Sequence, residues 1–444
     1  MPIVVALAGI LLLLFLVIRI KLQAFVALLL VSFAVGVAAG MPLDKVLLAI
    51  KNGMGETLGF IAVVVGLGAM FGQMLEVSGG VERLAQGLIA KLGEDKAQWA
   101  LAWTGFIVSI PIFFDVGFII IVPLVYALTR KTGRSLLYYG IPLVAGLAVT
   151  HAFVPPTPGP IAVAELLHAD LGWVILFGII AGIPATIVAG PLFARYIAKR
   201  ILAAVPEYFQ AEAKTVARAK ELPSFGAVVG IILLPLLLIV LNTVSGAWLP
   251  ESTLRSLLAF FGHPFVALMI ATLLAFFFFG THRGFTREEV QNIATKALEP
   301  AGIIILVTGA GGVFKQVLID SGVGKILGEI MAASSLPPLL LAFAIAAIIR
   351  IAQGSATVAM ITAAGIMSPI VTQLAMQGAR LGLMVIAIAA GASIASHVND
   401  SGFWLINRYF GLSEKDTLRS WTISATLVAV VGFLMVLVLS LFIR

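Results

Sequence analysis

Hydrogen-bonding and ionisable side chains gather in four short segments of an otherwise strongly apolar chain. The segments are SIPIFFDVGF (109–118), HAFVPPTPGP (151–160), RIAQGSATVAMIT (350–362) and ASIASHVNDSGFW (392–404). Ionisable side chains within membrane-compatible runs are energetically costly and are usually functional. These residue types can bind a polar solute and exchange a proton. We therefore predict a polar cavity at membrane depth.

The first segment contains Asp115, the single charged residue between positions 97 and 129. Pro111 and Gly117 weaken a helix around it. Non-helical backbone at membrane depth is tolerated only where it is buried or lines a watery cavity. We predict that Asp115 faces a substrate or proton path. The alternative is a helix cap at the membrane surface.

The second segment combines His151 with four prolines between positions 155 and 160. Such a run interrupts a helix and frees backbone groups for a ligand. The imidazole is a candidate proton carrier because its unperturbed pKa is about 6.5. A loop at the membrane surface would explain the prolines equally well.

The third segment places Gly354, Ser355 and Thr357 just after Arg350. It predicts a broken helix whose end presents amides and hydroxyls to an anion. Arg350 can bind a carboxylate through two parallel hydrogen bonds, or its long side chain can extend to the membrane surface instead. Close packing of small residues between helices is the alternative for the rest of the segment.

The fourth segment offers His397, Asn399, Asp400 and Ser401 within five residues. Together they supply donors, acceptors and a titratable pair, which suits a hydroxylated solute. The alternative is a turn outside the membrane, because Asn-Asp-Ser-Gly is favourable turn chemistry.

The composition places these segments in a membrane protein. Apolar residues make up 61% of the chain and charged residues 11%, against about 45–50% and 25% in soluble domains. A spanning helix needs roughly 20 apolar residues, and we count about 12 such segments. The first of them, residues 1–20, predicts a spanning helix rather than a cleaved signal peptide. The chain has no cysteine, and we predict neither a metal nor a cofactor.

Basic residues cluster in short connections, at Arg19 and Lys21, at 130–134 and at 195–221. The positive-inside rule places these connections in the cytoplasm. The net charge of +7 is therefore explained by topology, and nucleic acid is not an expected partner.

An internal repeat organises the chain. Residues 59–80 and 302–323, 243 positions apart, share ten identities in 22, including a common Phe-x-Gln-x-Leu-x-x-Ser-Gly pattern. We predict an all-α polytopic protein with broken or re-entrant helices in two transmembrane repeats, 1–200 and 223–444. A charged cytoplasmic linker, 201–222, joins them. An odd number of spans per repeat inverts the second copy, and we favour this arrangement.

The sequence also resembles the gluconate permease family. The similarity runs through GMPLDKV (40–46), FFDVGFIIIVPL (113–124), PPTPGP (155–160), LVTGAGGVFKQVLIDSGVGK (306–325), QGSATVA (353–359) and SHVNDSGFW (396–404). The resemblance implies a bacterial inner-membrane symporter of gluconate or a related sugar acid with protons, built from two inverted repeats with re-entrant hairpins. Relatives carry L-idonate, other aldonates or D-serine. Many members have histidine where this chain has Thr157.

These observations predict a proton-coupled secondary transporter that imports a small hydroxylated carboxylate. The predicted substrate-binding residues are Asp115, His151, Arg350, Gly354, Ser355, Thr357, His397, Asn399, Asp400 and Ser401. The candidate proton carriers are Asp115, His151, His397 and Asp400. The alternatives are a sodium-coupled carrier, a carrier of D-serine or another small carboxylate, and a passive channel. No zinc or aspartyl-protease motif indicates an enzyme, and the class of fold suggests a homodimer.

Overall fold

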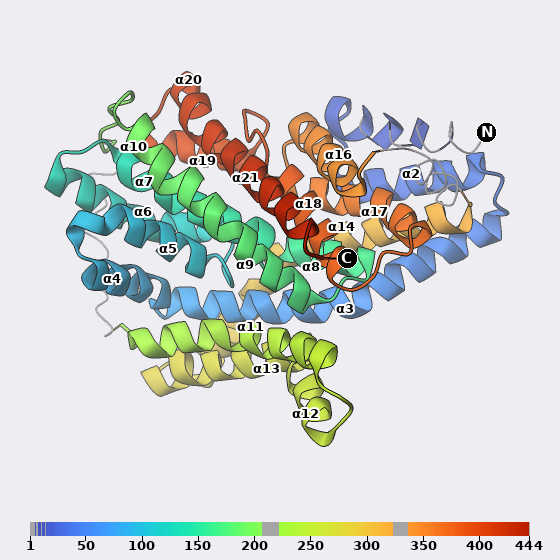
Figure 1. Cartoon of the computed structure of the whole chain (residues 1–444), viewed down its shortest axis with the longest axis horizontal. Coiled ribbons are helices and arrows are strands. Elements are labelled where there is room, and N and C mark those ends of the chain that lie inside the picture. The colour runs from blue at the N-terminus through green and yellow to red at the C-terminus, as the bar shows by residue number, and fades with distance from the viewer. Residues whose placement is uncertain are drawn as a thin grey trace.

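The computed structural model describes residues 5, 8, 9, 11–13, 15–206, 222–322 and 336–443. Within these ranges every regular element is a helix (Figure 1). Eight helical stretches are long and apolar enough to cross a bilayer, and three shorter apolar helices accompany them. The prediction of an all-α polytopic membrane protein is confirmed. The predicted first span, residues 1–20, is described only in part.

The repeat seen in the sequence recurs in the helix boundaries. Helix α8 (Pro158–Leu167) and helix α19 (Ser401–Phe410) begin and end 243 positions apart. Helix α7 (Leu136–Phe153) and helix α18 (Ala379–Gly391) begin at the same spacing. The long helices α3 (Leu43–Val77) and α14 (Arg287–Asp320) end at this spacing too. One pattern of elements is therefore used twice.

Equivalent helices α3 and α14 pack against each other in opposite directions. A Cβ atom added to Gly53 would lie 2.6 Å from the carbonyl oxygen of Gly312. A Cβ atom added to Gly309 would lie 2.4 Å from the Met54 sulfur and 3.1 Å from Leu58. Position numbers thus rise along α3 as they fall along α14. Antiparallel packing of equivalent long helices is what inverted repeats require.

The four polar segments coincide with four interruptions of the helices. The first separates α5 (Ala97–Val108) from α6 (Phe114–Thr132), and its equivalent separates α16 (Pro338–Gln353) from α17 (Ala356–Gln373). The other two are the hairpin turns between α7 and α8 and between α18 and α19. The predicted broken and re-entrant helices are confirmed.

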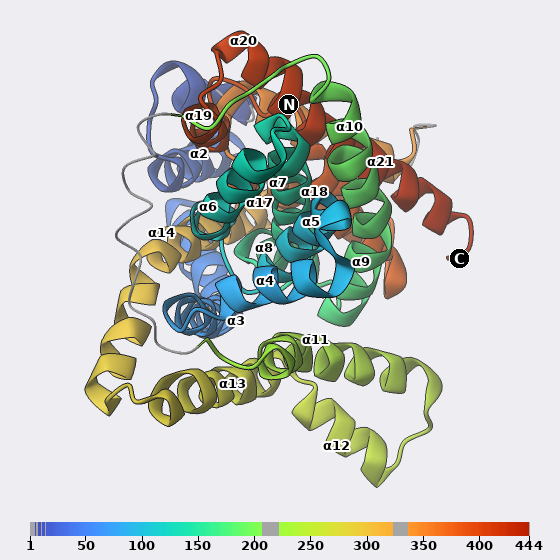
Figure 2. The same cartoon turned by 90° about the vertical axis from the view of Figure 1, so that its left-hand side faces the viewer.

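The other helices of the two repeats pack around the elements described above. α11 (Phe225–Trp248), α12 (Thr253–Phe261) and α13 (Pro264–Ala275) form a layer along one side (Figures 1 and 2). The remaining helices complete the bundle: α2 (Ala24–Ala38), α4 (Gly80–Leu92), α9 (Leu171–Ile187), α10 (Phe193–Ile197), α20 (Glu414–Thr417) and α21 (Ile423–Ser440).

The segment between the two halves lies largely outside the described residues, at 207–221. The predicted division at 201–222 therefore stays a prediction.

Candidate functional site

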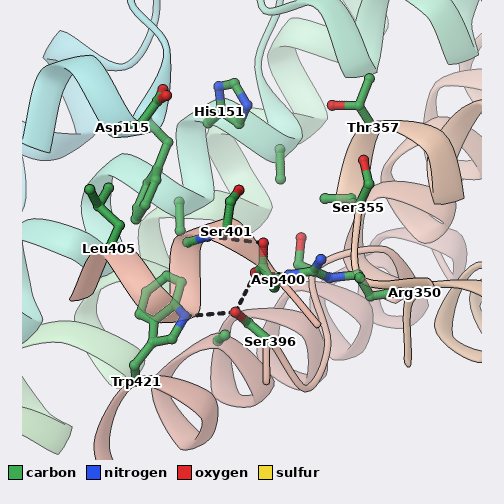
Figure 3. Close-up of a pocket in the computed structure, with 18 of the residues that line it drawn as sticks. Asp115, His151, Arg350, Ser355, Thr357, Ser396, Asp400, Ser401, Leu405 and Trp421 are labelled. Carbon is green, nitrogen blue, oxygen red and sulfur yellow. Dashed lines mark hydrogen bonds and ion pairs between the residues drawn. The ribbon is translucent and has the colours of Figure 1, made fainter. Parts of the chain in front are cut away.

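A cavity of about 520 Å³ opens where the interruptions of the second repeat meet α6 and α7 (Figure 3). Nine of the ten predicted binding residues line it: Asp115, His151, Arg350, Gly354, Ser355, Thr357, Asn399, Asp400 and Ser401. Asp115 and His151 come from the first repeat, and the other seven come from the second. Folding thus brings residues nearly 300 positions apart to one cavity.

Arg350 lies in the last turn of α16 with only 5% of its surface exposed. Its Nη2 atom forms an ion pair with Oδ2 of Asp400. Its Nε and Nη1 atoms are buried and have no hydrogen-bond partner among the described residues. Unsatisfied buried donors are costly, so the guanidinium is prepared to receive an additional acceptor. This burial also excludes extension of the side chain to the membrane surface.

The Asp400 carboxylate is held from several directions. Ser396 donates its hydroxyl to Oδ2, and the backbone N–H of Gly402 donates to Oδ1 at 3.1 Å. The indole N–H of Trp421 donates to the Ser396 hydroxyl at 2.7 Å. Together with Arg350, these groups give the Asp400 carboxylate three donors. It is the counter-ion that holds the arginine in place.

Ser396 and Trp421 were not among the predicted site residues. Ser396 stands within the fourth polar segment, so its position carried a signal. Trp421 lies in a π-helical turn between α20 and α21, Leu418–Thr422, and joins the network through its indole N–H. An isolated tryptophan in an apolar span gives no sequence signal for such a role, because tryptophan is common near membrane surfaces.

The break between α16 and α17 shapes the wall around Arg350. Gly354 ends α16 with φ of +89°, a left-handed conformation that favours glycine. Ser355 then begins α17, and its hydroxyl accepts a hydrogen bond from the Val358 N–H at 3.3 Å. The N-terminus of α17 faces the cavity beside Arg350, where the helix dipole favours negative charge. The broken helix predicted at 350–362 is confirmed.

Asp115 and His151 have a different environment from Asp400. Asp115 lies in the first turn of α6 and is exposed to the cavity. The part of the chain that the structure describes gives it no hydrogen-bond or ion-pair partner. The Nδ1 atom of His151 is buried without a partner among the described residues, and its ring packs edge-on against Phe113 with the ring centroids 6.1 Å apart.

His397 is the one predicted residue that the structure does not bring to the cavity. Its Nε2 atom lies 2.9 Å from the carbonyl oxygen of Ile351, at the unwound end of α16. The Asn399 amide donates to the same oxygen at 2.9 Å. The two side chains therefore fasten the second hairpin turn to the helix break. Asn399 also reaches the cavity, whereas His397 does not.

The equivalent junction of the first repeat, between the first break and the turn before α8, is tightly packed and mostly apolar. Arg350 corresponds to Ile107, Ser355 to Ile112 and Asp400 to Thr157. Only about 10 Å³ of space remains where the first break meets the turn before α8. Thr157 is buried there and donates its hydroxyl to the Val154 carbonyl at 2.7 Å. Thr157 therefore does not line the 520 Å³ cavity.

Comparison with known proteins places this geometry in a family. The family model described as GntP family permease matches residues 1–442. The chain belongs to the GntP permease family. The high-affinity gluconate transporter of Escherichia coli (strain K12) is 44% identical over 442 residues, covering 99% of this chain and 100% of the relative. The Gnt-II system L-idonate transporter of the same strain is 42% identical over 441 residues, covering 99% of this chain and 99% of the relative.

A gluconate permease of Bacillus licheniformis is 41% identical to this GntP permease and covers 100% of both chains. Among solved structures, the YdaH transporter of Alcanivorax borkumensis, whose topology is described as unusual, superposes with a TM-score of 0.66. The superposition covers 94% of this chain and 98% of that chain at 16% identity, so it supports the fold alone. The predictions of a permease rather than an enzyme, and of a multi-pass protein of the bacterial inner membrane, are confirmed.

Proposed function

We propose that this permease imports gluconate or a closely related sugar acid together with protons. The observation that carries the proposal is the buried guanidinium of Arg350, whose Nε and Nη1 atoms have no partner among the described residues. Relatives more than 40% identical along their whole length are named as gluconate and L-idonate transporters. Both substrates are hydroxylated monocarboxylates.

The substrate carboxylate is proposed to bind Arg350 and the N-terminus of α17. Nε and Nη1 are each free to donate a charge-assisted hydrogen bond to a carboxylate oxygen. Amides at a helix N-terminus favour the same negative charge. Asp400 neutralises part of the arginine charge, so the bound anion meets a balanced site rather than an isolated cation.

The hydroxyl groups of the substrate are proposed to bind the rest of the polar wall, formed by Thr357, Ser393, Asn399 and Ser401. Pockets for small ligands commonly enclose about 300–1,000 Å³, and this cavity of about 520 Å³ falls within that range. A linear sugar acid of six carbons fits such a space with water around it.

Asp115 is the proposed carrier of the coupled proton. Asp400 is already held by an ion pair with Arg350 and by hydrogen bonds from Ser396 and the Gly402 N–H. Asp115 has no such partners to lose. Movement of one proton with a monoanion leaves the transported pair neutral, which reduces the cost of crossing the membrane.

The test is uptake of labelled gluconate into proteoliposomes with an imposed inward proton gradient and no sodium. Accumulation that collapses on addition of a protonophore is the expected result. Equilibration without accumulation would contradict proton coupling and indicate a passive route. Uptake that appears only with a sodium gradient would favour the sodium-coupled alternative, and competition by D-serine or other aldonates would redefine the substrate.

A further inference from the structure

Asp115 lines two cavities rather than one. Besides the cavity that contains Arg350, it borders a second space of about 250 Å³ on the other side of the break between α5 and α6. Gln73 and Glu76 of α3 line this second space, together with Pro111 of the break and Pro300 of α14. A single carboxylate thus connects the proposed substrate site with a separate polar cavity.

Close packing fixes the second cavity next to the break. A Cβ atom added to Gly72 would lie 2.1 Å from the carbonyl oxygen of Pro111. The backbone of α3 therefore touches the break directly, and the next turn of α3 carries Glu76 to the cavity wall. Glu76 is half-buried, and the Gln73 amide donates to its Oε2 atom at 3.0 Å.

The charges around Glu76 are unbalanced. Asp115 is the charged group that lines the same cavity from α6, and α14 contributes only Ala297, Pro300 and Ile304. No lysine, arginine or histidine of the described chain lines this cavity. Like charges repel strongly in a low-dielectric space, so a proton held between the two carboxylates lowers the electrostatic energy.

We propose that the second cavity is the path of the coupled proton and that Glu76 exchanges this proton with Asp115. The inference rests on the proposed function of proton-coupled uptake. In the step, the Asp115 carboxyl group loses a proton and becomes a carboxylate, while the Glu76 carboxylate gains it and becomes an acid. Charge and electrons balance, and Asp115 takes up its next proton from the substrate cavity, which it also lines.

The position of the second cavity gives the path a direction. Glu76 lies at the C-terminal end of α3, and a Cβ atom added to the following Gly79 would lie 2.7 Å from Leu222. Leu222 ends the basic segment predicted to be cytoplasmic. The proton accepted by Glu76 therefore leaves towards the cytoplasm. The repeat equivalents of Asp115 and Glu76 are Val358 and Ile319, so only one half carries the path.

The experiment compares two kinds of transport by Glu76→Gln in proteoliposomes. Exchange of labelled for unlabelled gluconate at equal concentrations needs no net proton movement, whereas accumulation driven by a pH gradient does. We expect exchange within about twofold of the unaltered protein and driven accumulation lowered by about tenfold or more, the range typical of a lost proton-transfer group. Proton entry, followed with a pH-sensitive dye inside the vesicles, should fall in parallel.

Glu82→Gln is the matched control. Glu82 accepts a hydrogen bond from Gln86 at 2.8 Å, much as Glu76 does from Gln73, but it is exposed and lines neither cavity. Its exchange and driven uptake should both match the unaltered protein. Glu76→Asp retains a carboxylate and should restore much of the driven uptake.

Driven uptake by Glu76→Gln at the level of the control would overturn the inference. Equal loss of exchange and driven uptake in both Glu76 variants would also overturn it, because it would show a structural role. If the unaltered protein shows no proton-driven accumulation, the proposed function itself fails, and this outcome is visible without any Glu76 variant.

Discussion

Arg350 is a buried side chain whose hydrogen-bond donors are only partly satisfied by the described residues. Its carboxylate partner, Asp400, accepts from Nη2 alone, while Nε and Nη1 remain buried without an acceptor among the described residues. A buried donor without an acceptor costs roughly 1–3 kcal/mol. Substrate binding would recover this energy, so the two unpaired donors favour an occupied site.

Arg350→Lys is therefore expected to weaken binding. Lysine keeps the charge but has no planar fork to match a carboxylate. Loss of one charge-assisted hydrogen bond, about 1.5–3 kcal/mol, raises the KM for gluconate uptake roughly 10- to 150-fold. Uptake kinetics measure this change. Arg380→Lys, at an exposed position near the start of α18, is the control, and an unchanged KM in both variants would contradict the proposed carboxylate site.

Asp115→Asn is expected to separate binding from coupling. The side chain has no hydrogen-bond partner among the described residues, so an amide of the same shape should leave stability and gluconate exchange nearly unchanged. Proton-driven accumulation should fall by about tenfold or more, as for other lost proton-transfer groups. Full driven uptake by this variant, measured beside an exchange assay, would exclude Asp115 as the carrier.

Much of the cavity wall was predictable because polar residues in an apolar chain are conspicuous. Asp115, Arg350 and Asp400 all stood out in this way. The division of roles between the two aspartates was not predictable, since it depends on Arg350 and Ser396 approaching one of them in space. His397 was misplaced in the cavity because its nearest acceptor, the Ile351 carbonyl, is created by the unwinding of α16.

At the scale of elements, the helix breaks depend on a few backbone positions. Gly354 combines a φ of +89° with a close approach to the second hairpin turn, where an added Cβ atom would lie 2.1 Å from the Asn399 carbonyl oxygen. The break and the turn are therefore packed as one unit. Prolines and polar residues in the sequence located the breaks, whereas this contact between them required the fold.

Gly354→Ala is expected to disturb both partners of this contact. The variant should lower the midpoint of thermal unfolding in detergent and reduce gluconate uptake, because alanine is strained at positive φ and clashes with Asn399. Gly59→Ala is the control, since Gly59 lies within α3 and an added Cβ atom meets nothing within 4 Å. That change should be neutral or stabilising by about 0.5–1 kcal/mol. Equal thermal stability of the two variants would refute the expected strain.

At the scale of the whole molecule, the two repeats share one order of helices but differ in the space that they enclose. The sequence revealed the 243-residue spacing because glycines and a phenylalanine recur at equivalent positions of α3 and α14. The antiparallel direction of that contact was not visible in the sequence, because identical helices can pack either way. Which copy holds the open cavity also depends on packing, because the cavity is formed between elements that are distant in the sequence.

Equivalent positions in the two copies should therefore differ in accessibility. The chain has no cysteine of its own, so single cysteines report without background. Ser355→Cys faces the open cavity and should react quickly with a water-soluble thiol reagent, more slowly when gluconate is present. Thr157→Cys, at the repeat equivalent of Asp400, is buried where only about 10 Å³ of space remains and should react at least about tenfold more slowly. Equal labelling rates would contradict the observed asymmetry.

The placement of Arg350 opposite Ile107 has a consequence for how this protein can change over time. A duplicated gene begins with two equal copies, and either one can acquire the recognition chemistry. Here the proposed recognition residues lie mostly in the later copy, whereas the earlier copy supplies the proposed proton carriers Asp115 and Glu76. New substrate preferences can therefore arise by substitution in a small part of one half, while the other half preserves the machinery that all such variants share.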